Sequence, residues 1–141
     1  MSEAVLTPQS LLRMPDQDYM NAQQQVFFKG VLEQIKVETQ QQIEVIKQDI
    51  ASADCGTDEL DRALAEEENR QRMRLAERQY LLLRKIDKAL ARIAQGTYGY
   101  CEVTGDAIGL QRLLLRPTAE LCAEEKMRQE HLERNFAQRH L

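Results

Sequence analysis

The segment YGYCEVTGDAIGLQRL, residues 98–113, contains the residue types of half a metal-binding knuckle. It combines Cys101 with a glycine-containing turn and a short apolar return. A zinc knuckle would carry a second cysteine three residues after the first, and this chain has Thr104 there. A threonine hydroxyl is a poor zinc ligand because it stays protonated at neutral pH. Three interpretations are therefore open: a zinc site that has lost its metal, a redox site, or a hairpin with neither role.

A second group of chemically active side chains is acidic. Residues 54–68, DCGTDELDRALAEEE, contain seven carboxylates and one base, Arg62. Acids near the start of a helix are favoured by the helix dipole, so composition alone indicates a solvated turn. Asp58 and Asp61 are one helical turn apart and point the same way. At the end of a projecting arm, two such carboxylates are able to hydrogen-bond or repel groups inside a cleft that the arm enters.

Two long helices are predicted to flank this acidic turn. The first begins at Asn21, which opens a capping box, and it continues to the turn, where Gly56 ends it. Thr57 or Asp58 caps the second helix, which extends from about residue 59 to 95. Two helices of similar length joined by a short turn form an antiparallel hairpin.

Both helices have residues at the alternating spacing of three and four that is typical of a coiled-coil seam. In the first helix the predicted seam is Phe28, Leu32, Ile35, Thr39, Gln42, Ile46 and Ile50. In the second it is Met73, Ala76, Tyr80, Leu83, Ile86, Leu90 and Ile93. The step from Leu83 to Ile86 breaks the heptad rhythm and indicates a local distortion of the coil.

The rest of the chain is predicted to form a tail and a small globular head. Pro8 and Pro15 work against a long helix near the N-terminus. Residues 98–113 are predicted to be a two-stranded hairpin, and Pro117 and Thr118 to open a last helix. The predicted fold is dominated by α-helix, a long antiparallel coiled-coil hairpin with a head made of a degenerate zinc-finger-like hairpin and a C-terminal helix. The predicted division is a tail at 1–18, a helical hairpin at 19–95 with its tip at about 54–63, and a head at 96–141.

Composition excludes several classes of protein. The 141 residues are 43% hydrophobic, 5% aromatic and 30% charged, with a formal net charge of −4, which suits long helices better than a thick core. The negative charge argues against a zinc-finger DNA binder, and the absence of a nucleophile–base–acid set argues against an enzyme. No apolar run approaches the length of a membrane span and no signal peptide opens the chain. We expect a soluble cytoplasmic protein whose cysteines stay reduced.

Several motifs occur together in the order found in one family. The acidic turn reads D-x-x-D-x-A at Asp58, Asp61 and Ala63, and KIDKAL, YGYC, RPTAELC and Lys126 follow. From about residue 18 to about 135 the chain resembles the DksA/TraR family of bacterial transcription factors. The resemblance implies a non-enzymatic regulator that binds RNA polymerase and not promoter DNA. Its coiled-coil arm enters the secondary channel, places the tip near the active site, and alters open-complex stability together with ppGpp in the stringent response.

The resemblance also assigns roles to single residues. Asp58, Asp61 and Ala63 match the tip positions that carry the regulatory effect. Arg78 matches a position that contacts the polymerase rim. The positions that bind ppGpp correspond to Leu82, Lys85, Arg116 and Lys126, and the three cations among them suit a multiply phosphorylated nucleoside.

The family's zinc positions are degenerate in this chain. Many members bind zinc through two C-x-x-C pairs, which correspond here to Cys101 with Thr104 and Cys122 with Glu125. We expect no tightly bound zinc, membership of the zinc-independent subgroup, and a hydrogen bond between Thr104 and Glu125 in place of coordination. The two remaining cysteines should face each other, either as a redox pair or as packing residues, and Cys55 at the tip should be the more exposed thiol.

One alternative function stays open at this point. A structural or adaptor coiled-coil protein, whose head docks another partner, would show the same helices and the same head. The absence of polymerase binding would favour it. We expect a monomer, because one chain supplies both strands of the coil, with ppGpp as a co-regulator and no tightly bound cofactor.

Overall fold

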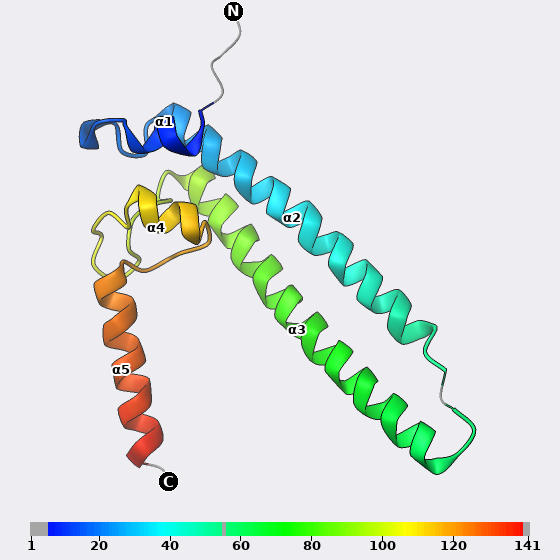
Figure 1. The fold of residues 1–141 in the computed structure, drawn as a ribbon. Helices are drawn as coiled ribbons and strands as arrows, with labels where there is room; N and C mark the ends of the chain where they lie inside the picture. The colour runs from blue at the N-terminus through cyan, green and yellow to red at the C-terminus, as the bar shows by residue number, and fades with distance from the viewer. Residues whose placement is uncertain (1–5, 55, 140–141) are drawn as a thin grey trace, which may run out of the picture. The chain divides into compact units, whose positions relative to one another are not determined.

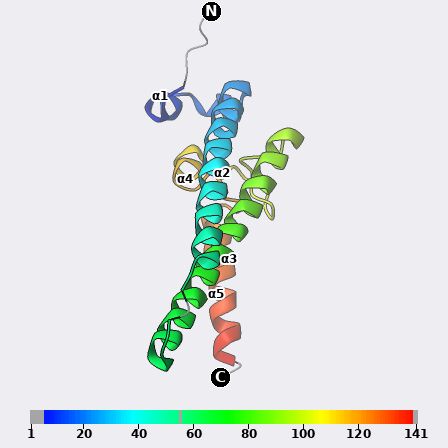
Figure 2. The same cartoon turned by 90° about the vertical axis from the view of Figure 1, so that its right-hand side faces the viewer.

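The computed structural model describes residues 6–54 and 56–139. Its helices are α1 (Pro8–Leu12), α2 (Ala22–Ala51), α3 (Glu59–Gln95), α4 (Leu110–Leu115) and α5 (Ala123–Arg139), with a 3-10 turn at Asp16–Asp18. Figures 1 and 2 show α2 and α3 lying along one another in opposite directions. The predicted all-α fold with a long antiparallel helical hairpin is therefore confirmed. The chain divides into two compact units, residues 1–32 with 88–141, and residues 33–87.

The start of α2 follows the predicted capping chemistry with one change. The backbone N–H of Gln24 donates to Asn21 Oδ1 at 2.9 Å, as in a capping box. The side-chain oxygen of Gln24 reaches back one residue further than expected and accepts from the backbone N–H of Met20 at 2.8 Å. These bonds satisfy N–H groups that a helix start otherwise leaves without partners.

The seam between the two long helices differs from the predicted one on both helices, and Met73, which was predicted to begin the seam of α3, is 55% exposed. On α2, Gln42 is exposed and Ile43, which was not predicted, is buried. On α3, Tyr80 is 37% exposed, while the neighbouring Gln79 is half-buried. With Gln79 in the seam, the spacing from Ala76 through Gln79 and Leu83 is regular, and the predicted heptad break is wrong. The prediction chose the apolar residue, but a coiled coil tolerates a polar side chain in its seam.

The head unit has its own apolar core. Leu11 of α1 and Leu113 of α4 are fully buried, and these two short helices are in contact. The fully buried Phe28 lies against the ring of Tyr98, with 5.6 Å between centroids. The Tyr98 hydroxyl donates to the carbonyl of Pro117 at 2.7 Å, and burial is the main reason why its pKa is raised.

Two predicted elements of the head are wrong. Residues 98–113 do not form a two-stranded hairpin, because the described backbone pairs only at Tyr100 and Ala107 and residues from Leu110 onward form α4. The last helix begins at Ala123 and not at Pro117. The carbonyls of residues 117, 120 and 121 accept hydrogen bonds from Tyr98, Glu102 and Arg112 respectively. This segment therefore binds neighbouring loops instead of making helical bonds.

None of the helices in the described ranges has both the length and the apolar character needed to cross a membrane.

Candidate functional site

The turn between α2 and α3 is fixed by short polar side chains. Asp58 caps α3, because its Oδ1 accepts from the backbone N–H of Asp61 at 2.7 Å. Asp54 Oδ1 accepts from the N–H of Gly56 at 3.2 Å. Gly56 has a φ of +72°, and a Cβ added there would overlap Cβ of Asp61. The turn therefore requires glycine at this position, both for its backbone conformation and for its close approach to α3.

The two aspartates of the tip have different roles in this geometry. Asp58, Asp61 and Ala63 are all exposed. The Asp58 carboxylate is engaged in the cap, whereas no hydrogen bond or ion pair within the described part of the chain engages the carboxylate of Asp61. Asp61 is thus the tip acid that is free to act on an external group. Cys55, predicted to be an exposed thiol, lies outside the described residues.

The degenerate zinc positions form a small polar cluster in the head. The Thr104 hydroxyl lies 4.0 Å from Cys122 Sγ and accepts from the N–H of Asp106 at 3.3 Å. Burial raises the pKa of the Cys101 thiol, but hydrogen bonds from Thr104 and from backbone N–H groups outweigh this effect and lower it to about 6. Thr104 therefore interacts with both thiol groups.

Glu125 does not make the hydrogen bond predicted for it. Its buried carboxylate accepts two bonds from the Arg128 guanidinium, at 2.7 and 3.1 Å, and one from Gln129 at 3.4 Å. The bonds from Arg128 lower the pKa of Glu125. The expected Thr104–Glu125 bond is therefore wrong, because an arginine one turn along α5 forms a charge-assisted pair with the same carboxylate.

These residues do not fit a tetrahedral zinc ion. The four positions present two thiols, one hydroxyl, and one carboxylate already bound to Arg128. In the described ranges, no three His, Cys, Asp or Glu side chains gather into a group able to hold a metal. His131 lies on α5 near Asn135, at 3.3 Å, and His140 falls outside the described residues.

The residues assigned to ppGpp and to the polymerase rim lie on two helices, α3 and α5, and at the position that follows α4. Arg78, Leu82 and Lys85 are on α3 in the unit of residues 33–87. Arg116 ends α4 and is exposed, and Lys126 is on α5, 3.9 Å from Glu130. The last two residues belong to the other unit.

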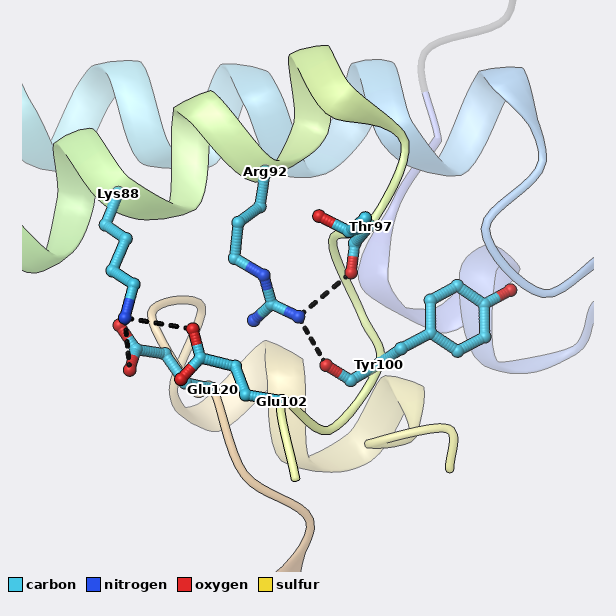
Figure 3. Close-up of polar contacts among 6 residues, drawn as sticks. All are labelled: Lys88, Arg92, Thr97, Tyr100, Glu102 and Glu120. Carbon is cyan, nitrogen blue, oxygen red and sulfur yellow. Dashed lines mark hydrogen bonds and ion pairs between the residues drawn. The ribbon is translucent and has the colours of Figure 1, made fainter. Parts of the chain in front are cut away.

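Two cations near the end of α3 organise the head loops, and sequence reasoning missed both. Figure 3 shows Lys88 between Glu102 and Glu120, at 2.9 and 3.1 Å. Arg92 is only 9% exposed and donates to the carbonyls of Thr97 and Tyr100 (Figure 3). Positions four residues apart share a helix face, but that spacing cannot identify partners in irregular loops.

The Lys88 contacts join the two chain segments that carry the cysteines. Glu102 follows Cys101 directly, and Glu120 lies two residues before Cys122. The backbone N–H of Glu102 also donates to the carbonyl of Glu120 at 2.9 Å. These contacts therefore hold the two segments together.

Comparisons with known proteins agree with this architecture. The family described as "DnaK suppressor protein DksA, N-terminal domain" matches residues 24–93, and "Prokaryotic dksA/traR C4-type zinc finger" matches residues 96–131. The RNA polymerase-binding transcription factor DksA of Caulobacter vibrioides is 39% identical over 127 residues, which cover 84% of either chain. Its counterpart in Escherichia coli K12 is 35% identical, covering 87% of this chain and 82% of the relative.

A solved structure shares the fold. The structure of transcription factor DksA2 from Pseudomonas aeruginosa is 48% identical, with a TM-score of 0.82, and the match covers 91% of this chain and 99% of that one. The helical hairpin, the acidic tip and these matches lead to one conclusion. The chain belongs to the DksA/TraR family, whose DksA members are transcription factors and not enzymes.

Proposed function

We propose that this protein regulates transcription by binding RNA polymerase, with the α2–α3 hairpin entering the secondary channel. The tip then lies near the polymerase active site and destabilises open complexes at promoters of the ribosomal RNA type. ppGpp strengthens the effect, as in the stringent response. The relatives' name, RNA polymerase-binding transcription factor, supports the choice of partner, and such a partner places the protein in the cytoplasm.

The observation that carries this proposal is the state of the tip. Asp58 is used to cap α3, which fixes the first turn, and Asp61 one turn away keeps an exposed carboxylate. A carboxylate on a defined helix end is able to interact with cations or backbone donors at a fixed position. Ala63 follows on the same exposed turn, so all three residues of the family motif are present.

Charge supports a nucleotide site that the protein shares with the polymerase rim. Lys85, Arg116 and Lys126 provide cations for phosphate groups, and Leu82 provides an apolar contact. Arg78 contacts the rim. The protein acts as a monomer, because both strands of its coil come from one chain.

We further propose that the head belongs to a zinc-independent subgroup. Thr104 and Glu125 replace two cysteines, and Arg128 occupies the Glu125 carboxylate. Lys88 joins the two cysteine-bearing segments instead. Cys101 and Cys122 remain as packing residues around the Thr104 hydroxyl.

Transcription in vitro from a ribosomal RNA promoter tests the proposal, with and without ppGpp. Wild type should bind core RNA polymerase and reduce the transcript, more strongly when ppGpp is present. Asp61→Asn should bind polymerase with unchanged affinity and lose the reduction, because it removes the free charge and leaves the cap intact. If wild type does not bind core polymerase, the proposal is wrong and a structural coiled-coil role is favoured.

A further inference from the structure

One flank of the helical hairpin carries a groove that the tip chemistry does not use. It lies between α2 and α3 within the unit of residues 33–87 and has a volume of about 630 Å³. Glu38, Val45 and Asp49 line it from α2, and Leu75 and Gln79 line it from α3. We call it the flank groove.

The groove combines an apolar floor with acidic ends. Val45 is 56% exposed and Leu75 is 40% exposed, so both offer apolar surface to a partner. Glu38 and Asp49 are eleven residues apart on α2, or about 16 Å at 1.5 Å per residue. Neither carboxylate is in an ion pair with another described residue, and the described lining contains no lysine or arginine.

A buried acceptor in the groove also lacks a donor. The side-chain oxygen of Gln79 is inaccessible to solvent and has no hydrogen-bond partner among the described residues. Leaving such a group unpaired costs about 1–3 kcal/mol. Because solvent cannot reach this oxygen, a partner in the groove cannot reach it either, and the amides of Gln41 and Gln42 supply the lining with hydrogen-bond donors. What the described lining lacks is positive charge.

The opposite flank of the hairpin is closed by the chain itself. Lys36 Nζ lies 2.8 Å from Asp87 Oδ1, which joins α2 to α3. Lys47 Nζ lies 5.7 Å from the centre of the Tyr80 ring and makes a second link. Because each helical residue turns by 100°, Lys36 and Lys47 lie on the side of α2 away from Glu38. On the groove flank, no ion pair between described residues joins α2 to α3.

The groove is continuous with the surface that we propose for the polymerase. Leu75, Arg78, Gln79 and Leu82 follow one another at spacings that place them on one side of α3. Arg78 is the proposed rim contact. A segment that contacts Arg78 therefore extends naturally over Leu75 and Gln79.

We infer that the flank groove binds a segment of RNA polymerase that has a basic side chain at each end and an apolar side chain between them. The basic groups pair with Glu38 and Asp49, and the apolar side chain packs on Val45 and Leu75. This inference rests on the proposed function, since it identifies a further contact of the same complex.

Competition binding to core RNA polymerase tests the inference, with labelled wild type as the displaced ligand. Glu38→Gln combined with Asp49→Asn should weaken binding about ten-fold at low salt, and less at high salt, because charge pairs at an interface rim are screened. Gln79→Lys should weaken binding at least as much, since it places a cation of the chain's own in the groove. The matched control is Glu33→Gln with Glu44→Gln, which removes two exposed charges of α2 outside the groove and should bind like wild type.

Each outcome has a separate meaning. Wild type that fails to bind polymerase overturns the proposed function itself. If wild type binds polymerase and the groove variants bind as tightly as the control pair, only the inference about the flank groove is wrong. A dimer of wild type that the groove variants abolish, measured by sedimentation, would assign the groove to a second copy and also overturn the inference. Circular dichroism and thermal unfolding check that every variant keeps its helices.

Discussion

At the scale of single residues, the head depends on groups that were not predicted from their spacing. Cys101 and Thr104 were identified from the sequence because their positions follow a known ligand pattern. Arg128 was not, although it determines what Glu125 does. An arginine three residues after a glutamate is common on helices, and only burial of the glutamate makes this pair important.

The hydrogen bonds to Cys101 predict a pH dependence of stability. Its pKa is about 6 in the folded head and near its ordinary value of 9.0 in the unfolded chain. Between these values the folded state holds a thiolate and the unfolded state a thiol, so stability rises with pH in this window and is lost as pH falls through about 6. Thermal unfolding from pH 5.5 to 9 under reducing conditions should show this rise. Cys101→Ser should show a smaller slope, and an identical slope would contradict the assignment.

Removal of Arg92 should lower the stability of the protein much more than removal of Lys88, although both side chains contact the head loops. Arg92→Met leaves two carbonyls in the buried site without donors and should lower the free energy of unfolding by about 2–4 kcal/mol. Lys88 is 51% exposed, so Lys88→Met should cost at most about 1 kcal/mol. Urea unfolding measures both values. Equal losses of unfolding free energy would show that burial does not make Arg92 more important for stability than Lys88.

At the scale of helices, sequence patterns located the elements well and their inner faces less well. The second long helix was predicted at about 59–95, and α3 is Glu59–Gln95. Capping residues and glycines mark such boundaries through local bonds, which a sequence displays directly. The seam was harder to predict, because Gln79 is more buried than Tyr80. Hydrophobic periodicity cannot identify a polar seam position, since it assumes that the inner face is apolar.

Two glycines of the hairpin should respond in opposite ways to alanine. Gly56→Ala places a side chain at a φ of +72° against Asp61, so it should distort the tip and abolish the effect on transcription while polymerase binding remains. Gly30 is inside α2 with open space around it, and Gly30→Ala should stabilise the protein by about 0.5–1 kcal/mol. Transcription assays and urea unfolding measure these effects. Normal regulation by Gly56→Ala would show that the tip does not need this turn.

At the scale of the whole molecule, contacts other than metal coordination act on the segments that carry the zinc-finger positions. The family pattern for a C4-type zinc finger still matches residues 96–131. Lys88 and one backbone bond between Glu102 and Glu120 join its two cysteine-bearing segments, and the buried Arg92 holds the first of these segments through Tyr100. None of these contacts was predictable from the ligand positions alone, because two of them come from side chains of α3 and the third joins two loop backbones.

This arrangement predicts that zinc dependence can be restored by two substitutions. Wild type purified without chelator should contain far less than one equivalent of zinc, and a chelator should leave its melting temperature unchanged. Thr104→Cys combined with Glu125→Cys supplies four thiols at the family positions, so this variant should bind one equivalent and melt at a lower temperature when the metal is removed. The control is Thr104→Ser with Glu125→Gln, which changes the same positions without adding a ligand. A full equivalent of zinc in wild type would overturn the zinc-free head, and a double cysteine variant that stays metal-free would show that the four positions no longer converge.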